Sequence, residues 1–223
     1  KNAVGNFIDQ VTANATGDPA TNEDDVTHRI GIVKFSGNES DQIGNDTYRS
    51  DGNTYNYSQA VQDLTSVTGN VQSLKNAVNE LAAAGSTRTD FGLNQAQRVL
   101  DGDWQHGLGG AREEAKQVVV VFTDGEPSTF SNWSGGVAAN AVNLAKDLKD
   151  DKVTVYTIGM FEDADPSDTD GRFNKYMNGV SSNYPNAEVT NWRGDRTQDW
   201  DDCKLGTRVT EGNYYFAADD AEE

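Results

Sequence analysis

Two short polar segments of this sequence carry the residue types that bind hard metal cations. The first reads Gly-Ser-Thr-Arg-Thr-Asp from Gly85 to Asp90, and it presents hydroxyl groups and a carboxylate after a glycine. The second reads Thr-Asp-Gly-Glu-Pro-Ser from Thr123 to Ser128, and it follows a strongly apolar run. Hard cations such as Mg²⁺ prefer oxygen ligands in octahedral geometry and keep some of their waters. A site made of hydroxyls and one or two carboxylates fits that chemistry.

Capping of a helix or turn is the alternative role for the same side chains. Ser, Thr and Asp at the start of a helix or turn accept hydrogen bonds from backbone N–H groups. Capping accounts for Thr89 or Asp90 more readily than for Thr87. For Asp124, position alone leaves capping and ligand binding equally open.

The apolar pattern predicts strands that alternate with helices around these two segments. Apolar residues at helical spacing predict helices at 4–11, 71–82, 137–148 and 173–180, and a further helix that Asp90 caps and that ends near Leu100. Strands are predicted at 28–35, 118–122, 153–158 and 214–216, with a last helix from Ala217. The continuous apolar run 118–122 is typical of a parallel strand covered on both faces.

Alternating strands and helices indicate an α/β fold, with a doubly wound, mostly parallel sheet flanked by helices. Ligands of such sheets bind beyond the carboxyl ends of the strands, so the loops after Phe35, Phe122 and Ile158 should hold the site. The 223 residues suit one domain, with polar insertions near 37–63 and 186–210.

The net charge of −18 excludes some classes of partner. A chain this acidic repels nucleic acid and anionic membrane surfaces, whereas it favours cations and a solvated surface. No stretch is long and apolar enough to cross a membrane, and no signal peptide opens the chain. The single cysteine, Cys203, allows no internal disulfide. Exported Gram-positive proteins often have almost no cysteine, so secretion stays open.

Together, Gly-Ser-Thr-Arg-Thr-Asp-Phe-Gly-Leu and Val-Val-Val-Phe-Thr-Asp-Gly-Glu-Pro resemble the second and third parts of the metal-ion-dependent adhesion site of von Willebrand factor A domains. The resemblance implies a Rossmann-like fold and a bound Mg²⁺, or Mn²⁺ or Ca²⁺. It extends to the helix that opens the chain and to the segments 28–35 and 153–159. It implies that the metal ligands are Thr87 and Asp124, and that the ligand-binding or outer-shell groups are Glu126, Ser128, Thr89 and Asp90.

One part of the family's site is not found in the sequence. The family places an Asp-x-Ser-x-Ser motif at the end of its first, central strand, immediately before the helix with which this chain opens. The motif occurs nowhere in the 223 residues. We therefore expect an upstream segment to supply that strand. Without such a strand the sheet would expose two unpaired edges and much apolar surface.

Residues 173–185 resemble A domains of cell-wall-anchored adhesins and pilus-tip proteins of Gram-positive bacteria, which also carry long polar insertions. The resemblance implies a secreted or cell-surface protein, anchored to the cell wall through regions outside this chain. It implies a protein partner, in the host extracellular matrix or on a cell surface, that supplies a carboxylate to the cation. It implies neither nucleic acid binding nor membrane insertion.

Two other functions compete with metal-dependent adhesion. One is a structural stalk or pilus-assembly domain that keeps the fold with an incomplete metal site. The other is a metal-assisted hydrolase with Asp124 as metal ligand and Glu126 as base. The hydrolase lacks a histidine or a second carboxylate at a neighbouring strand end, so we expect a binding module and not an enzyme.

Two further clusters have simple structural explanations. The acidic residues between Asp163 and Asp170 lack the glycine and glutamate of an EF-hand, so we favour a solvated loop over a calcium loop. Trp192 and Trp200, with the arginines between them, could form a recognition surface, but we favour loop packing.

Overall fold

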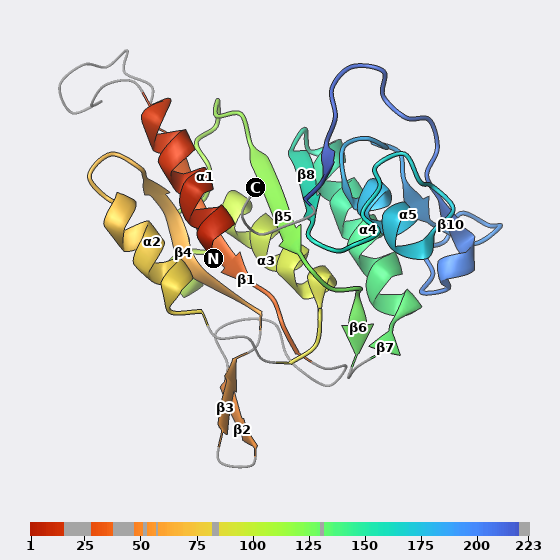
Figure 1. Ribbon diagram of the computed structural model, residues 1–223, viewed down its shortest axis with the longest axis horizontal. Helices are drawn as coiled ribbons and strands as arrows, with labels where there is room; N and C mark the ends of the chain where they lie inside the picture. Colours follow the sequence, from red (N-terminus) through yellow and green to blue (C-terminus); the bar gives the residue numbers. More distant parts are fainter. Residues whose placement is uncertain are drawn as a thin grey trace.

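A computed structural model describes residues 1–15, 28–37, 47–50, 53–56, 58–81, 85–129 and 132–218. Its centre is a parallel sheet of three strands in the order β11-β8-β5, with β5 at Val118–Thr123, β8 at Thr154–Gly159 and β11 at Tyr215–Ala217 (Figure 1). Val118 is the register partner of Thr154, and Thr123 that of Gly159. Helices flank this sheet, so the predicted α/β fold is confirmed.

A second, antiparallel pair of strands lies on the other side of the molecule. It consists of β1 at Arg29–Lys34 and β4 at Gln59–Ser66. Strand β4 begins inside the stretch 37–63 that the sequence analysis assigned to a polar insertion, and that assignment is wrong for its last residues. The large apolar residues of β4, Val61 and Leu64, lie three apart and do not alternate, which hides the strand. The same stretch holds the hairpin of β2 at Thr47–Ser50 and β3 at Asn53–Asn56.

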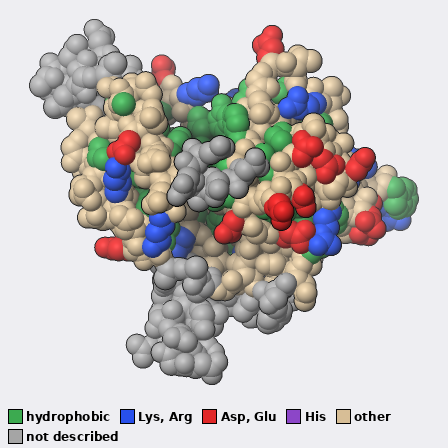
Figure 2. All heavy atoms as spheres, in the orientation of Figure 1, with side chains coloured by type: hydrophobic (Ala, Val, Ile, Leu, Met, Phe, Trp, Pro, Cys, Tyr) green, Lys and Arg blue, Asp and Glu red, His purple; other side chains and the backbone are tan. Residues whose placement is uncertain are grey.

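Within the described residues, no strand pairs with the outer edge of β5 or with the free edge of β1. Val118 is 42% exposed and Phe7 is 37% exposed, and the Phe7 ring meets the edge of the Phe122 ring at 6.4 Å. Figure 2 shows hydrophobic side chains gathered on the visible face in this area. The predicted parallel strand at 118–122 is confirmed by its pairing with β8. Its faces are covered only in part by the described residues, because Val121 is buried whereas Val118 is exposed and Val120 is half-buried.

In the described part of the chain, five α-helices surround the strands. They are α1 at Asn2–Ala13, α2 at Val71–Asn79, α3 at Thr89–Asp101, α4 at Gly135–Asp150 and α5 at Arg172–Val180. Helix α2 packs on α1, β1 and β4, whereas α5 packs on β8 and α4. Helix α3 contacts β1, β4 and α4, so it joins the two sides of the molecule (Figure 1). A 3-10 turn at Trp104–His106 follows α3.

The larger core gathers around α4. Ser134 caps this helix by accepting a hydrogen bond from the Val137 N–H, and small alanines let α4 approach its neighbours closely. Lys149, near the end of α4, is buried and donates from Nζ to the carbonyls of Gly179, Ser181 and Tyr184. The Gly179 carbonyl lies in the last turn of α5 and the Ser181 and Tyr184 carbonyls follow it, so Lys149 ties the two helices together.

The stretch 186–210, predicted as a polar insertion, contributes to this core. It forms a small hairpin of β9 at Glu188–Val189 and β10 at Cys203–Lys204, joined through a 3-10 turn at Trp200–Asp202. The Asn143 side chain accepts from the Val189 N–H at 2.9 Å and donates to the Val189 carbonyl at 3.1 Å. A buried amide with both functions satisfied fixes β9 on α4, a contact that composition alone does not reveal.

At the two ends of the described residues, helix α1 agrees with the predicted helix at 4–11, and strand β11 agrees with the predicted strand at 214–216. Ala217 belongs to β11 and does not start a helix, and residues 219–223 lie outside the described part. Among the described helices, none has the length and apolar character needed to span a bilayer.

Candidate metal-binding site

The two polar segments meet at the carboxyl end of β5. The Thr87 N–H donates to Ser128 Oγ at 3.0 Å, and the Ser128 N–H donates to the Thr87 carbonyl at 3.0 Å. A Cβ atom added to Gly125 would lie 3.1 Å from Thr87 Oγ1, so the Thr87 hydroxyl packs directly on the Asp124–Gly125 backbone. Ser128 opens the short hairpin of β6 at Ser128–Thr129 and β7 at Asn132–Trp133, which lies below β5 in Figure 1.

The loop after β5 is fixed by its own hydrogen bonds. The buried Thr123 hydroxyl donates to the Gly125 carbonyl at 2.9 Å and accepts from the Gly125 N–H at 3.3 Å. The Thr123 carbonyl accepts from the Met160 N–H at 3.0 Å, which ties the loop to the residue after β8. Asp124 is therefore held at the sheet edge between two anchored residues.

Thr87 and Asp124 keep their side-chain oxygens available. Asp124 is exposed and Thr87 is half-buried, and neither side chain forms a hydrogen bond or ion pair with a described residue. A carboxylate and a hydroxyl without protein partners are oxygen donors of the kind that a Mg²⁺ with several bound waters takes. The described residues contain no group of three or more His, Cys, Asp or Glu that could hold a metal. Thr87 and Asp124 offer only oxygen ligands, and oxygen is the ligand type that a hard cation prefers.

Glu126 points to a different partner. Its two carboxylate oxygens accept from Arg172 Nε at 3.1 Å and Nη2 at 2.7 Å. The Arg172 guanidinium also lies over the Trp133 ring, 5.0 Å from the centroid. The hydrogen bond to Glu126 raises the pKa of Arg172, so the Arg172 guanidinium stays charged at any physiological pH. Glu126 thus lies at the rim of the site with its carboxylate already bound.

Asp90 is turned into the fold. It is 3% exposed, and its two oxygens accept from Arg88 Nε and Nη2, both at 2.8 Å. Asp90 Oδ1 also accepts from the Phe91 N–H at 3.0 Å, and α3 begins at Thr89, so Asp90 lies in the first turn and does not cap the helix from outside. The Arg88 guanidinium stacks on the Phe91 ring at 3.5 Å. The structure does not bring the Asp90 carboxylate to the surface beside Asp124.

Thr89 lies one layer below the candidate site. It is 1% exposed, and its hydroxyl is directed at the hydroxyl of buried Tyr176, whose pKa burial raises. Neither hydroxyl reaches acceptable hydrogen-bond geometry with any described residue. Of the six predicted residues, the structure therefore groups Thr87, Asp124, Glu126 and Ser128 at one surface, whereas Thr89 and Asp90 are buried beneath them.

Arg172 and Trp133 are the site residues that sequence reasoning missed. Arg172 is the first residue of α5, and the loop before it leaves the carboxyl end of β8, the strand next to β5. The rule that ligands bind beyond the carboxyl ends of parallel strands could have identified it, because the loop after Ile158 was expected at this edge. Trp133 had no comparable signal.

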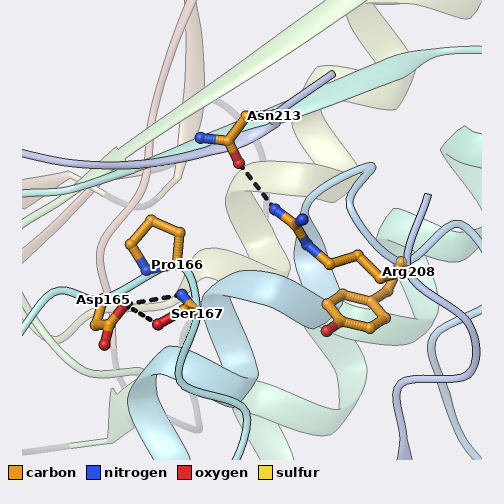
Figure 3. Close-up of a pocket in the computed structure, with 6 residues that line it drawn as sticks. Asp165, Pro166, Ser167, Arg208 and Asn213 are labelled. Atoms are coloured by element: carbon orange, nitrogen blue, oxygen red, sulfur yellow. Dashed lines mark hydrogen bonds between the residues drawn. The ribbon is translucent and has the colours of Figure 1, made fainter. Parts of the chain in front are cut away.

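The acidic loop 161–171 is held by its own carboxylates. Asp165 Oδ1 accepts from the N–H and hydroxyl of Ser167, and Asp168 Oδ1 accepts from the N–H groups of Asp170 and Gly171. These hydrogen bonds lower the pKa of both aspartates. A cavity of about 410 Å³ lies beside Asp165, and Arg208, hydrogen-bonded to Asn213, lines its opposite side (Figure 3).

The two tryptophans of stretch 186–210 have different surroundings. Trp200 packs edge-on against Trp133 at 5.5 Å, as loop packing predicts. Trp192 is 83% exposed, with only the Arg193 guanidinium over its ring at 4.5 Å, so the loop-packing interpretation is wrong for Trp192.

Comparison with known proteins identifies the family. The von Willebrand factor type A domain matches residues 1–193. Proximal thread matrix protein 1 from the mussel byssus is similar in structure at 15% identity and a TM-score of 0.45, over 81% of this chain and 35% of that chain. The same mussel protein with a zinc-occupied MIDAS motif is similar at 16% identity and a TM-score of 0.45, over 97% of this chain and again 35% of that chain. No curated protein matches the sequence. Because the family match spans most of the chain and the fold agrees with it, this chain belongs to the von Willebrand factor type A domain family.

Proposed function

We propose that this domain binds a protein partner through a divalent cation held at the carboxyl end of β5. The observation that carries the proposal is that two uncommitted oxygen ligands lie on loops that hydrogen-bond to one another: the Thr87 hydroxyl, which packs on Gly125, and the carboxylate of the adjacent Asp124. Structural capping would consume these oxygens, and neither forms a hydrogen bond with a described residue.

Mg²⁺ is the cation that this donor set suits, with Mn²⁺ or Ca²⁺ as substitutes. Thr87 and Asp124 would hold it, and Ser128 would keep Thr87 in place through its backbone hydrogen bonds. The cation would supply a positive charge with an exchangeable coordination position for a carboxylate of the partner. Glu126 is withheld from that position by Arg172, so the partner meets no competing carboxylate from the rim.

A segment upstream of Lys1 is proposed to complete both the sheet and the site. The facing edges of β1 and β5 share no strand within the described residues, and apolar side chains are exposed beside them. A strand ending in Asp-x-Ser-x-Ser would pair with such edges and bring further oxygen ligands to Asp124. A longer protein that carries this strand should bind the cation more tightly than the present chain.

The biological setting of this proposal is a secreted or cell-wall-anchored protein of a Gram-positive cell surface, with a partner in the host matrix or on another cell. A net charge of −18 agrees with a solvated surface module that uses a cation, and it disfavours nucleic acid. A stalk or pilus-assembly domain is the second candidate, and the edges of β1 and β5, unpaired within the described residues, favour it if no upstream strand supplies the missing motif.

Titration of Mg²⁺ into this chain tests the proposal. We expect Mg²⁺ to shift the amide resonances of Thr87 and Gly125, and Asp124→Asn to abolish the shift without changing the unfolding midpoint. Asp151→Asn is the matched control. Asp151 is also exposed, but it caps the C-terminus of α4, whereas the candidate site lies near the hairpin that leads into the N-terminus of α4. Equal Mg²⁺ affinity in Asp124→Asn and wild-type protein would contradict the cation site. Titration of Mg²⁺ with no response in the wild type would favour the stalk.

A further inference from the structure

Two positively charged side chains lie over two tryptophan rings next to the candidate metal-binding site, and we call this group the ledge. We define the ledge as Trp133, Trp200, Arg172 and Lys175. The Trp133 and Trp200 rings meet edge to face at 5.5 Å, Arg172 lies over Trp133 at 5.0 Å, and Lys175 Nζ lies over Trp200 at 5.7 Å. Arg172 and Lys175 are three apart on α5, so they project from the same side of that helix.

The ledge is joined to the cation site by Glu126. Glu126 stands two residues after Asp124, and its neighbour Gly125 packs on the Thr87 hydroxyl. Its carboxylate holds Arg172 Nε and Nη2, which brings the guanidinium to the rim of the loop that carries Asp124.

Half of the Arg172 guanidinium is left for another acceptor. The group carries five N–H donors, and Glu126 engages only Nε and Nη2. Nη1 forms no hydrogen bond with a described residue, and the side chain is 56% exposed. An ion pair this exposed contributes little to stability, because solvent screens it. The Trp133 ring and the Glu126 carboxylate instead fix the orientation of a guanidinium whose outer edge faces solvent.

We infer that Arg172 is a specificity-determining residue that selects partners carrying two acidic groups, one for the cation and one for Arg172. This inference rests on the proposed cation site. Guanidinium binds carboxylate through charge-assisted hydrogen bonds that are stronger than neutral ones. Across a chain with a net charge of −18, an acidic segment meets favourable charge only where cations gather. The ledge places Arg172 at the loop that carries Asp124, through Glu126, and adds Lys175 three residues further along α5. The partner segment is therefore an acidic peptide with two carboxylates a few residues apart.

Blocked glycine peptides that contain one aspartate, or two aspartates separated by one to three glycines, test this inference. Each peptide is titrated into the Mg²⁺-saturated chain at low salt, and binding is followed by the Trp133 indole N–H resonance. We expect one two-aspartate peptide to bind about tenfold more tightly than the one-aspartate peptide. In Arg172→Gln that preference should fall to about twofold or less, with the affinity for the one-aspartate peptide unchanged.

Arg196→Gln is the matched control. Arg196 also forms a bidentate surface pair, with Asp147, and its side-chain exposure of 54% is close to that of Arg172, but it contacts the later half of α4. It should keep the full preference. A preference retained in Arg172→Gln, or absent from Mg²⁺-bound wild-type protein, overturns the role of Arg172. The Thr87 and Gly125 amide shifts from the same samples report Mg²⁺ binding independently, so a failed cation site is distinguished from a failed selectivity residue. If Mg²⁺ leaves these amides unmoved, the cation site and this inference are both overturned.

Discussion

The two sides of this molecule differ in how completely their cores are packed. We call the side around α4, α5 and β8 the complete side, and the side around α1, α2, β1 and β4 the incomplete side. The side around α4, α5 and β8 has a large core in which buried polar groups such as Asn143 and Lys149 find partners. The side around α1, α2, β1 and β4 has a small core centred on Ile8, Leu74 and Val78. Every residue of β4 is only half-buried, whereas β8 alternates between buried and half-buried positions.

The difference shows where the fold supports the candidate site. Thr123, Asp124 and Glu126 extend from the β5 edge of the complete side, and Arg172 comes from α5 on the same side. Thr87 precedes α3, the helix that contacts both sides. The proposed cation site therefore joins a hydrogen-bonded loop from one side to a segment whose position depends on how firmly α3 holds the two sides together.

The largest effect should come from the same truncation made in each core. Leu148 on α4 and Leu74 on α2 are both fully buried leucines. We expect Leu148→Ala to lower the free energy of unfolding by about 3–5 kcal/mol, and Leu74→Ala by about 2–3 kcal/mol, because half-buried neighbours can close part of the second cavity. Urea unfolding of both variants measures the difference. Equal losses would mean that the smaller core is as tightly packed as the larger one.

The sequence predicted the complete side better than the incomplete one. The runs 118–122 and 153–158 and the helix at 137–148 are strongly apolar or periodic, and α4, β8 and part of β5 contribute to one large core. Strand β4 was missed because a half-buried strand needs few apolar residues, and Gln59–Ser66 has only three: Ala60, Val61 and Leu64.

The candidate site shows the same division between what sequence can and cannot predict. Thr87 and Asp124 could be predicted because each belongs to a contiguous motif. The pairing of Glu126 with Arg172 could not, because 46 residues separate them and only the packing of α5 brings them together. Burial of Asp90 was likewise hidden, since a helix-capping motif does not reveal that Arg88 two residues earlier will take up the carboxylate.

An intermediate effect should be a pH dependence of the free energy of unfolding that arises from Lys149, a buried residue of the complete side. Burial lowers the pKa of Lys149 to about 7, from 10.5 in an unfolded chain. Above pH 7 the unfolded state then binds more protons than the folded state, so stability rises with pH, by at most about 1.4 kcal/mol per pH unit from this group. We expect the rise between pH 7 and 8.5 in urea unfolding.

Lys149→Met should remove that rise. The two proteins differ only at position 149, so the difference between their two slopes isolates Lys149. Cys203 contributes little in this window, because burial raises its pKa from 9 to about 11 and the thiol of the unfolded chain is still mostly protonated at pH 8.5. Parallel pH profiles for the wild type and Lys149→Met would show that Lys149 keeps its proton, held by the three carbonyls of Gly179, Ser181 and Tyr184.

The smallest effect should be a difference in the stability that N-capping gives to α4 and to α2, the main helices of the two cores. Ser134 accepts the Val137 N–H at the start of α4, whereas Asn70 at the start of α2 makes no side-chain cap and donates to the Thr68 carbonyl instead. Ser134→Ala should cost about 1 kcal/mol, and Asn70→Ala no more than a few tenths, since only the first removes a bond to an otherwise unpaired helix N–H. Chemical denaturation resolves the two if both variants are measured together. A cost at Asn70 equal to that at Ser134 would mean that α2 is capped in solution, and the incomplete side would then owe its weakness to its sheet edges and not to its helices.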